Sequence, residues 1–275
     1  MPGAIRFCVL SALLLLSSTA LHGQAPKAPS DPTSQLPPVV VHMLNTQVAW
    51  DDGLNHPNGP RLRFAKVDEV TRPEGHFIRY RIYAAGVPEG APYILAAWVI
   101  GKKLDDLNVL SSSVYVNHKG LLLTRKPNPN EEDSDTVGQD AEYDLGVQAA
   151  DGEPLRFVLR SPDNKVLVPG TLVPFPVESA DNGCKLSALL ATPDGEAILI
   201  EGDGFAPNTD VLVQSNSEGE VRTSKQSVDA NGHLQFVELP YVIEKDVGTL
   251  NDTISTKNCT VSVNVPWGKG TYHRH

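Results

Sequence analysis

Short segments with a strand-like pattern follow one another from residue 61 almost to the C-terminus. In residues 76–83 (HFIRYRIY), Ile78, Tyr80 and Ile82 alternate with two arginines. This period of two gives a strand one buried face and one wet face. Gly, Pro, Asn and Asp, which favour turns, separate the segments. Short strands at this spacing favour β-sandwiches over a parallel α/β sheet.

The other segments of this kind are predicted as strands on the same grounds. One stretch, residues 103–110, instead predicts a short helix. The expected strands comprise residues 61–67, 76–83, 93–100, 113–116, 120–124, 155–160, 166–173, 211–213, 221–228, 233–238 and 258–265.

Residues 1–23 have the three parts of a secretory signal peptide. Arg6 supplies the positive charge, residues 9–16 (VLSALLLL) form an apolar run, and small residues follow. The run is shorter than the about 20 apolar residues that cross a bilayer. Residues 24–38 (QAPKAPSDPTSQLPP) hold almost no large apolar groups, which predicts a disordered spacer. We therefore expect a secreted or periplasmic protein, with no integral membrane segment after leader cleavage.

A domain boundary is expected at residues 174–183 (PFPVESADNG). Two prolines and a small polar cluster interrupt the strand pattern there. We expect an N-terminal β-sandwich domain over residues 39–176, a second β-sandwich domain over residues 180–268 and a tail over residues 269–275. The folded part is long enough for two domains of ordinary size.

The chain is acidic, with 33 Asp and Glu residues against 23 Lys and Arg residues and a formal net charge of −10. Such a chain, without a basic stripe, gains no counterion-release energy from nucleic acid and is not attracted to anionic membrane surfaces. The composition argues against nucleic acid as a partner. It is typical of a surface that keeps an exported protein soluble.

A recurring pattern of glycine and aromatic residues marks the C-terminal part. Two glycines, 202 and 204, permit a tight bend where a side chain would clash, and the aromatic residue after them is expected to fill the core. Further along, an Asn-Gly pair predicts a hairpin that joins residues 221–228 to residues 233–238. The pattern comprises Gly202, Gly204, Phe205 and Pro207, followed by Asp229, Asn231, Gly232 and Phe236.

This pattern resembles the immunoglobulin-like modules that occur in tandem on bacterial secreted proteins, with Gly-x-Gly-Phe-x-Pro and a later Asp-x-(Asn/Asp)-Gly hairpin. The resemblance implies a β-sandwich that acts as a spacer, stalk or interaction domain, and it implies no activity. The chain departs from the pattern near its end, where Gly248 is followed by Leu250 and not by a tyrosine. The predicted fold class is all-β, with two tandem β-sandwich (immunoglobulin-like) domains after a signal peptide and a disordered Pro-rich spacer.

Two cysteines remain once the leader and Cys8 are removed. Cys184 and Cys259 both fall in the expected C-terminal domain, and the exported compartment is oxidising. A disulfide between them is the prediction. The alternative is a reactive thiol pair, which lacks support because the chain has no Cys-x-x-Cys and no His or Lys cluster beside either cysteine.

Common catalytic patterns are absent from the sequence. There is no Gly-x-Ser-x-Gly, no His-Glu-x-x-His and no phosphate-binding Gly-x-x-x-x-Gly-Lys. The Gly-x-Gly at Gly202 lacks the third glycine of a dinucleotide loop and is followed by Pro207. No catalytic residue and no cofactor is predicted. A hydrolase whose residues converge from distant strands stays open, because geometry and not spacing defines such sites.

Two loops carry candidate ligand-binding residues. The acidic residues Asp133, Asp135 and Asp140 lie in residues 125–142 (RKPNPNEEDSDTVGQDAE), and their oxygens suit calcium. The alternative is a solvated acidic loop, since the spacing does not fit an EF-hand.

The second loop surrounds Trp50, an aromatic residue expected to be exposed. Its neighbours could hydrogen-bond a sugar stacked on the indole. The alternative is an ordered loop anchored by Trp50. The candidate ligand-binding residues are Trp50, Asp51, Asp52, Asn55 and His56.

These features predict an exported, non-catalytic protein that acts through protein contacts in the cell envelope or the extracellular space. The expected partner is an unidentified envelope or extracellular protein. The alternative is a carbohydrate-binding or accessory module with a glycan as its partner, and the third hypothesis is a hydrolase.

Overall fold

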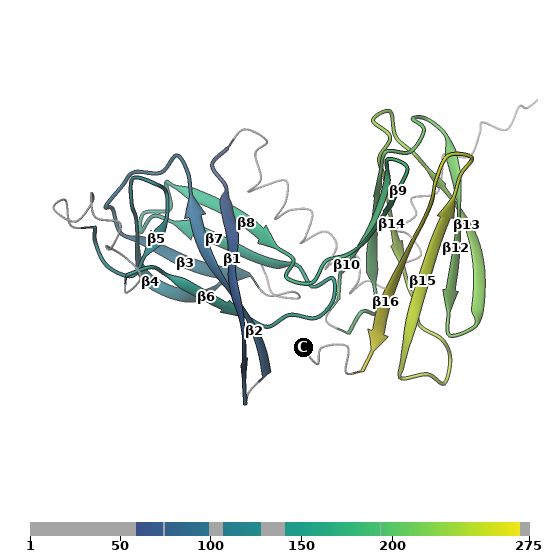
Figure 1. The fold of residues 1–275 in the computed structure, drawn as a ribbon, viewed down its shortest axis with the longest axis horizontal. Coiled ribbons are helices and arrows are strands. Elements are labelled where there is room, and N and C mark those ends of the chain that lie inside the picture. Colours follow the sequence, from purple (N-terminus) through teal and green to yellow (C-terminus); the bar gives the residue numbers. More distant parts are fainter. Residues whose placement is uncertain (1–58, 74, 99–106, 128–140, 193, 270–275) are drawn as a thin grey trace, which may run out of the picture. The chain divides into compact units, whose positions relative to one another are not determined.

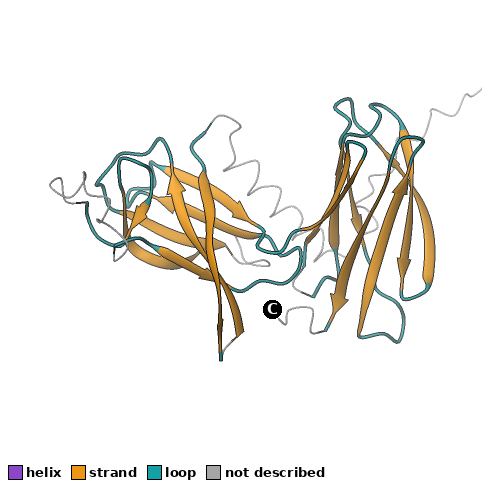
Figure 2. Ribbon diagram, viewed as in Figure 1, coloured by secondary structure: helices purple, strands orange, loops and turns teal. Residues whose placement is uncertain are grey.

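The computed structural model describes residues 59–73, 75–98, 107–127, 141–192 and 194–269. Within these ranges the chain is all-β, with several antiparallel sheets and no helix (Figures 1 and 2). No helix of the described residues is long and apolar enough to span a membrane. The fold confirms the predicted class of tandem β-sandwiches, which are built from β1–β8 and β9–β16.

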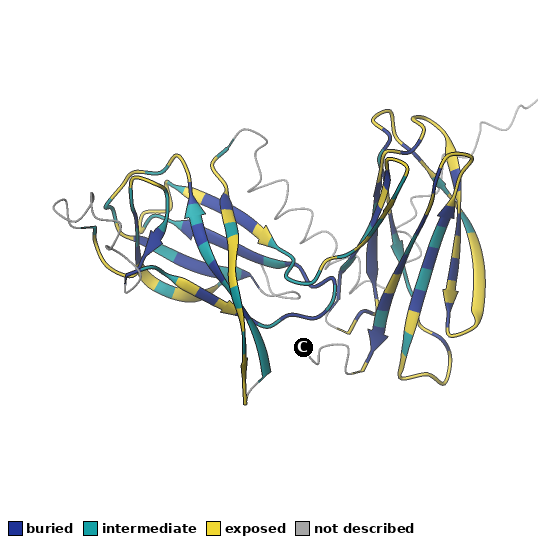
Figure 3. Ribbon diagram, viewed as in Figure 1, coloured by how far each residue is buried: buried dark blue, intermediate teal, exposed yellow. Residues whose placement is uncertain are grey.

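The first sandwich packs a sheet of order β1-β2-β6 against a sheet of order β5-β4-β3-β7-β8. Ile78, Tyr80 and Ile82 on β2 all face the core, so the alternation in this segment is confirmed. Figure 3 shows the same alternation of buried and exposed residues along other strands. The strands are β1 (Leu62–Arg72), β2 (Gly75–Ala84), β3 (Tyr93–Trp98), β4 (Asn108–Val116), β5 (Leu122–Leu123), β6 (Asp144–Val147), β7 (Leu155–Arg160) and β8 (Leu167–Leu172).

The helix predicted over residues 103–110 is wrong where the structure describes it. Asn108, Val109 and Leu110 begin strand β4, and residues 103–106 lie outside the described residues. Val109 is the register partner of Ala96 on β3. Pairing with a neighbouring strand satisfies the backbone here, and it outweighs the local helical pattern.

The second sandwich packs a sheet of order β14-β11-β10-β9 against a sheet of order β13-β12-β15-β16. Leu186, Ile200, Leu250 and Val263 are among the apolar side chains that form its core. The strands are β9 (Val177–Asp181), β10 (Cys184–Leu190), β11 (Ile198–Asp203), β12 (Asp210–Ser217), β13 (Glu220–Ser227), β14 (Leu234–Glu238), β15 (Val247–Ser255) and β16 (Thr260–Gly268).

The predicted disulfide is confirmed. Cys184 opens β10 and Cys259 directly precedes β16, and their Cα atoms are 6.3 Å apart. Because β10 and β16 belong to different sheets, the bridge joins the two layers of this sandwich.

The bend predicted at Gly202 and Gly204 forms directly after β11. Gly204 has a φ of 78°, and a Cβ there would collide with the carbonyl oxygen of Gly183. Phe205 follows and is buried in the core. Glycine is required at position 204 by its backbone conformation and by this close approach together.

The hairpin predicted between residues 221–228 and 233–238 is wrong in its pairing. The turn forms, and Asp229 Oδ1 accepts hydrogen bonds from the backbone N–H groups of His233 and Asn231. These bonds, His233 first, lower the pKa of Asp229. However, β13 pairs with β12 and β14 pairs with β11, so the turn crosses between sheets. Pairing beside β11 buries the apolar residues Leu234 and Phe236 of β14 in the core, whereas the single apolar residue of β13, Val221, is exposed.

Candidate functional site

The ligand-binding residues predicted from sequence lie outside the described residues. They stay predictions, both for the aromatic loop and for the acidic loop. Within the described ranges, no group of three or more His, Cys, Asp or Glu side chains is placed to hold a metal ion. The residues concerned are Trp50, Asp51, Asp52, Asn55, His56, Asp133, Asp135 and Asp140.

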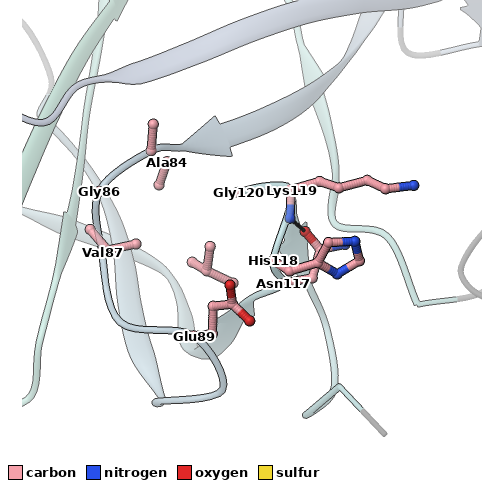
Figure 4. Close-up of a pocket in the computed structure, with 10 residues that line it drawn as sticks. Ala84, Gly86, Val87, Glu89, Asn117, His118, Lys119 and Gly120 are labelled. Atoms are coloured by element: carbon pink, nitrogen blue, oxygen red, sulfur yellow. Dashed lines mark hydrogen bonds between the residues drawn. The ribbon is translucent and has the colours of Figure 1, made fainter. Parts of the chain in front are cut away.

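A shallow cavity of about 190 Å³ lies between the β2–β3 connection and the β4–β5 turn (Figure 4). Glu89 comes from the first of these loops and His118 from the second, and Lys119 extends away from Glu89. Asn117 stabilises the conformation of the β4–β5 turn. Its Oδ1 accepts hydrogen bonds from the backbone N–H groups of Lys119 at 3.0 Å and Leu121 at 2.9 Å. Glu89, His118 and Lys119 are exposed to solvent. The cavity therefore offers a small polar surface.

A more unusual surface lies on the β14–β15 connection, residues 239–246, which we call the contact loop. Tyr241 is 58% exposed and Ile243 is 77% exposed, and Val247 directly after the loop is 53% exposed. Val242 between them is buried and anchors the loop in the core. The sequence places three large apolar side chains in water within seven residues.

Hydrogen bonds hold the contact loop in place. Trp267 on β16 donates its indole N–H to Ser217 Oγ at 3.0 Å, and the Ser217 hydroxyl donates to the carbonyl oxygen of Pro240 at 2.5 Å. The Tyr241 ring lies 6.1 Å from the Trp267 ring, centroid to centroid. The backbone N–H of Lys245 donates to the carbonyl of Val242 at 3.1 Å. The apolar side chains are thus presented by a loop of defined shape.

Two carboxyl groups lie close together in the same sandwich: Asp252 in its interior, and the half-buried Glu238 at the end of β14, the strand that leads into the contact loop. Asp252 on β15 is fully buried, at 0% exposure, on the face that also carries Leu250 and Ile254. Its register partner on β12 is Ser215. The Ser215 hydroxyl donates to Glu238 Oε1 at 3.2 Å. Neither carboxylate oxygen of Asp252 has a partner in good hydrogen-bond geometry among the described residues, although the Ser215 hydroxyl is close enough to act on its pKa.

The surroundings of these two groups favour their neutral forms. Burial first, and the negative charge of Asp252 second, raise the pKa of Glu238 to about 7, against the hydrogen bond from Ser215 and the charge of Arg222. Burial also raises the pKa of Asp252 to about 6, against the smaller effect of Ser215. Burial in a low dielectric disfavours the charged form of a carboxyl.

Sequence reasoning missed this pair. The available signal was one acidic residue at a core position of an alternating strand, in Leu250-x-Asp252-x-Ile254. Glu238 carried no such signal, because it ends its strand. Raised carboxyl pKa values are a property of many acid–base sites, but Asp252 points into the sandwich core.

Comparisons with known proteins identify no family. No family model matches the chain, and no curated protein matches it. Among solved structures, a tetra-tandem repeat in the extending region of a large adhesion protein is 11% identical, with a TM-score of 0.25, over 76% of this chain and 49% of that chain. A Ca²⁺-stabilized adhesin that helps an Antarctic bacterium reach out and bind ice is 13% identical, with a TM-score of 0.19, over 70% and 43%.

A pullulanase from Anoxybacillus sp. LM18-11 is also similar, at 13% identity and a TM-score of 0.20, over 72% of this chain and 24% of that chain. This chain thus spans less than two thirds of each of these three proteins. Similarity of this size assigns neither adhesion nor hydrolysis to the chain.

Proposed function

We propose that the protein is an exported, non-catalytic interaction module that binds a partner protein through the contact loop. The observation that carries this proposal is the exposure of Tyr241 and Ile243 on the contact loop and of Val247 directly after it. Hydrogen bonds from Trp267 to Ser217 and from Ser217 to Pro240 hold this loop in place. Grouped apolar side chains in water are typical of interaction surfaces. A fixed loop also loses little conformational entropy when it binds.

The chemistry of the contact loop favours a protein over a sugar. Ile243 and Val247 offer no hydrogen-bonding side-chain groups, whereas sugar recognition needs many. Three charged residues, Glu244, Lys245 and Asp246, follow Ile243 and are exposed. An apolar centre with a charged border is the usual composition of a protein interface. The partner we propose carries an apolar pocket with polar groups around it.

Export is supported by the disulfide of the second sandwich. Disulfides form and persist in oxidising compartments, and the Cys184–Cys259 bridge joins the two layers of the sandwich that carries the contact loop. We propose that this sandwich is the rigid support of the loop in the cell envelope or outside the cell.

The proposal is tested by affinity capture with residues 24–275 from the native envelope and medium, with mild cross-linking and mass spectrometry. The test variant replaces Tyr241 and Ile243 by serine. The matched control replaces Leu212 and Val221 by serine, since these apolar residues are exposed on β12 and β13. We expect one stoichiometric protein that the test variant loses and the control retains. Equal capture by both variants would exclude the loop, and recovery of glycan without protein would favour the carbohydrate-binding alternative.

A further inference from the structure

We propose that Asp252 and Glu238 together hold a proton at neutral pH, and that its release at higher pH loosens the contact loop. This inference rests on the proposed function for the role of the loop, but not for the proton itself. It makes the second sandwich a module whose contact surface is ordered in acid solution and becomes less ordered as pH rises through neutrality.

The first ground is the position of Asp252. The side chain is fully buried, and neither oxygen has a partner in good hydrogen-bond geometry among the described residues; the Ser215 hydroxyl, which donates to Glu238, offsets the burial of Asp252 only in part. An ionised carboxylate without a partner in an apolar interior is costly, and such groups bind a proton instead. The raised pKa values of both carboxyls agree with this geometry.

The second ground is the shortage of hydrogen-bond donors and positive charges around the pair. A serine hydroxyl has one O–H to donate, and that of Ser215 points to Glu238. Arg222, the register partner of Ser215 on edge strand β13, acts on Glu238 but is paired with Glu220. A proton on either carboxyl removes one of two neighbouring negative charges, one fully buried and one half-buried.

The remaining strands around the pair bring no titratable group to the core within the described part of the chain. Val263 is the register partner of Asp252 on β16. Glu244, Lys245 and Asp246 of the contact loop are exposed. The core-facing side chains of β10, β11 and β16 are apolar, and they include Leu186, Ala188, Leu190, Ile198, Ile200, Val261, Val263 and Val265.

The third ground is the covalent and hydrogen-bonded link from the pair to the contact loop. Glu238 is the last residue of β14, so the loop begins with the next residue. Ser217 lies two residues after Ser215 on the same core face of β12 and holds the Pro240 carbonyl. When both carboxyls are ionised, repulsion drives Glu238 outward toward Arg222 and water. This movement pulls on Pro240, two residues further along the chain.

The direction of the pH effect follows from the raised pKa values. The folded state binds these protons more tightly than the unfolded state does, so their contribution to stability is lost as pH rises through about 6 and 7. The exposed Asp210 behaves in the opposite way. Its pKa is lowered, chiefly by Lys225, and its contribution is lost as pH falls.

The test is hydrogen exchange of residues 24–275 at about pH 5.5 and about pH 8, expressed as protection factors so that intrinsic exchange rates cancel. We expect protection of β14, β15 and the contact loop to fall by roughly a hundredfold between these values, because each pKa unit changes the folding equilibrium tenfold. Asp252→Asn and, independently, Glu238→Gln should reduce this fall to less than about tenfold. The control Asp210→Asn should retain the full fall.

Three results would overturn the inference. The first is a pH-independent protection of the contact loop in the wild-type protein, and the second is the same fall in both neutral variants. The third is a rescue by millimolar Ca²⁺ at high pH that Asp252→Asn abolishes, which would make the pair a cation site. Because no partner is present in this experiment, its result is independent of whether the loop binds a protein.

Discussion

Trp267 and Ser217 are joined by a buried hydrogen bond of 3.0 Å, from the indole N–H to the hydroxyl oxygen. The Ser217 hydroxyl in turn donates to the carbonyl oxygen of Pro240. The pair therefore ties β16 and β12 to the first residues of the contact loop, and it explains how a loop with exposed apolar side chains keeps a fixed shape.

Replacing Ser217 by alanine should destabilise the second sandwich by about 1–3 kcal/mol, because the Trp267 N–H and the Pro240 carbonyl both lose a buried partner. Urea denaturation of residues 24–275 measures the free energy of unfolding. The control is Thr223→Ala, on an exposed position of β13, which should change it by less than about 0.5 kcal/mol. Equal effects of the two variants would contradict the bridging role of Ser217.

Gly204→Ala should cost about 3 kcal/mol or more. A left-handed conformation costs a non-glycine residue about 1–2 kcal/mol, and overpacking adds about 1–3 kcal/mol. Gly183→Ala separates the two effects, because Gly183 also has a positive φ of 87° but has open space within 4 Å of the position that a Cβ would occupy. Thermal unfolding should show a clearly larger loss for Gly204→Ala. A loss no larger than that of Gly183→Ala would show that the contact with the Gly183 carbonyl is easily relieved.

Cys184→Ser should lower the stability of the second sandwich by about 4 kcal/mol, the chain-entropy value for a bridge between residues 75 apart. Differential scanning calorimetry measures the shift in melting temperature. Reductant should lower the melting temperature of the wild type and leave that of Cys184→Ser unchanged. An unchanged melting temperature of the oxidised variant would mean that the bridge does not contribute to stability.

The strands and the disulfide were readable from sequence because their signals are local. Alternation along residues 76–83 reports a half-buried strand directly, and two cysteines in one domain that is expected to be exported have one pairing. Gly204 was readable too, since a bend with a positive φ selects glycine.

Strand pairing and the approach of Asp252 to Glu238 were not readable, because they depend on residues far apart in sequence. The Asn231-Gly232 turn looks the same whether the next strand pairs with β13 or crosses to β11. The helix expected over residues 103–110 is replaced by strand β4 from Asn108 for the same reason, because β3 supplies the backbone hydrogen-bond partners of β4. Asp252 meets Ser215 and Glu238 only once three strands have assembled.

The most direct test of the central claim is site-specific photo-cross-linking in the native envelope and medium. A photoreactive amino acid replaces Ile243 in the contact loop, and in a separate protein it replaces Leu212, which is also exposed, on β12. We expect a single protein adduct from position 243 and none from position 212. Adducts of the same protein from both positions, or only from position 212, would contradict the assignment of the contact loop as the binding surface.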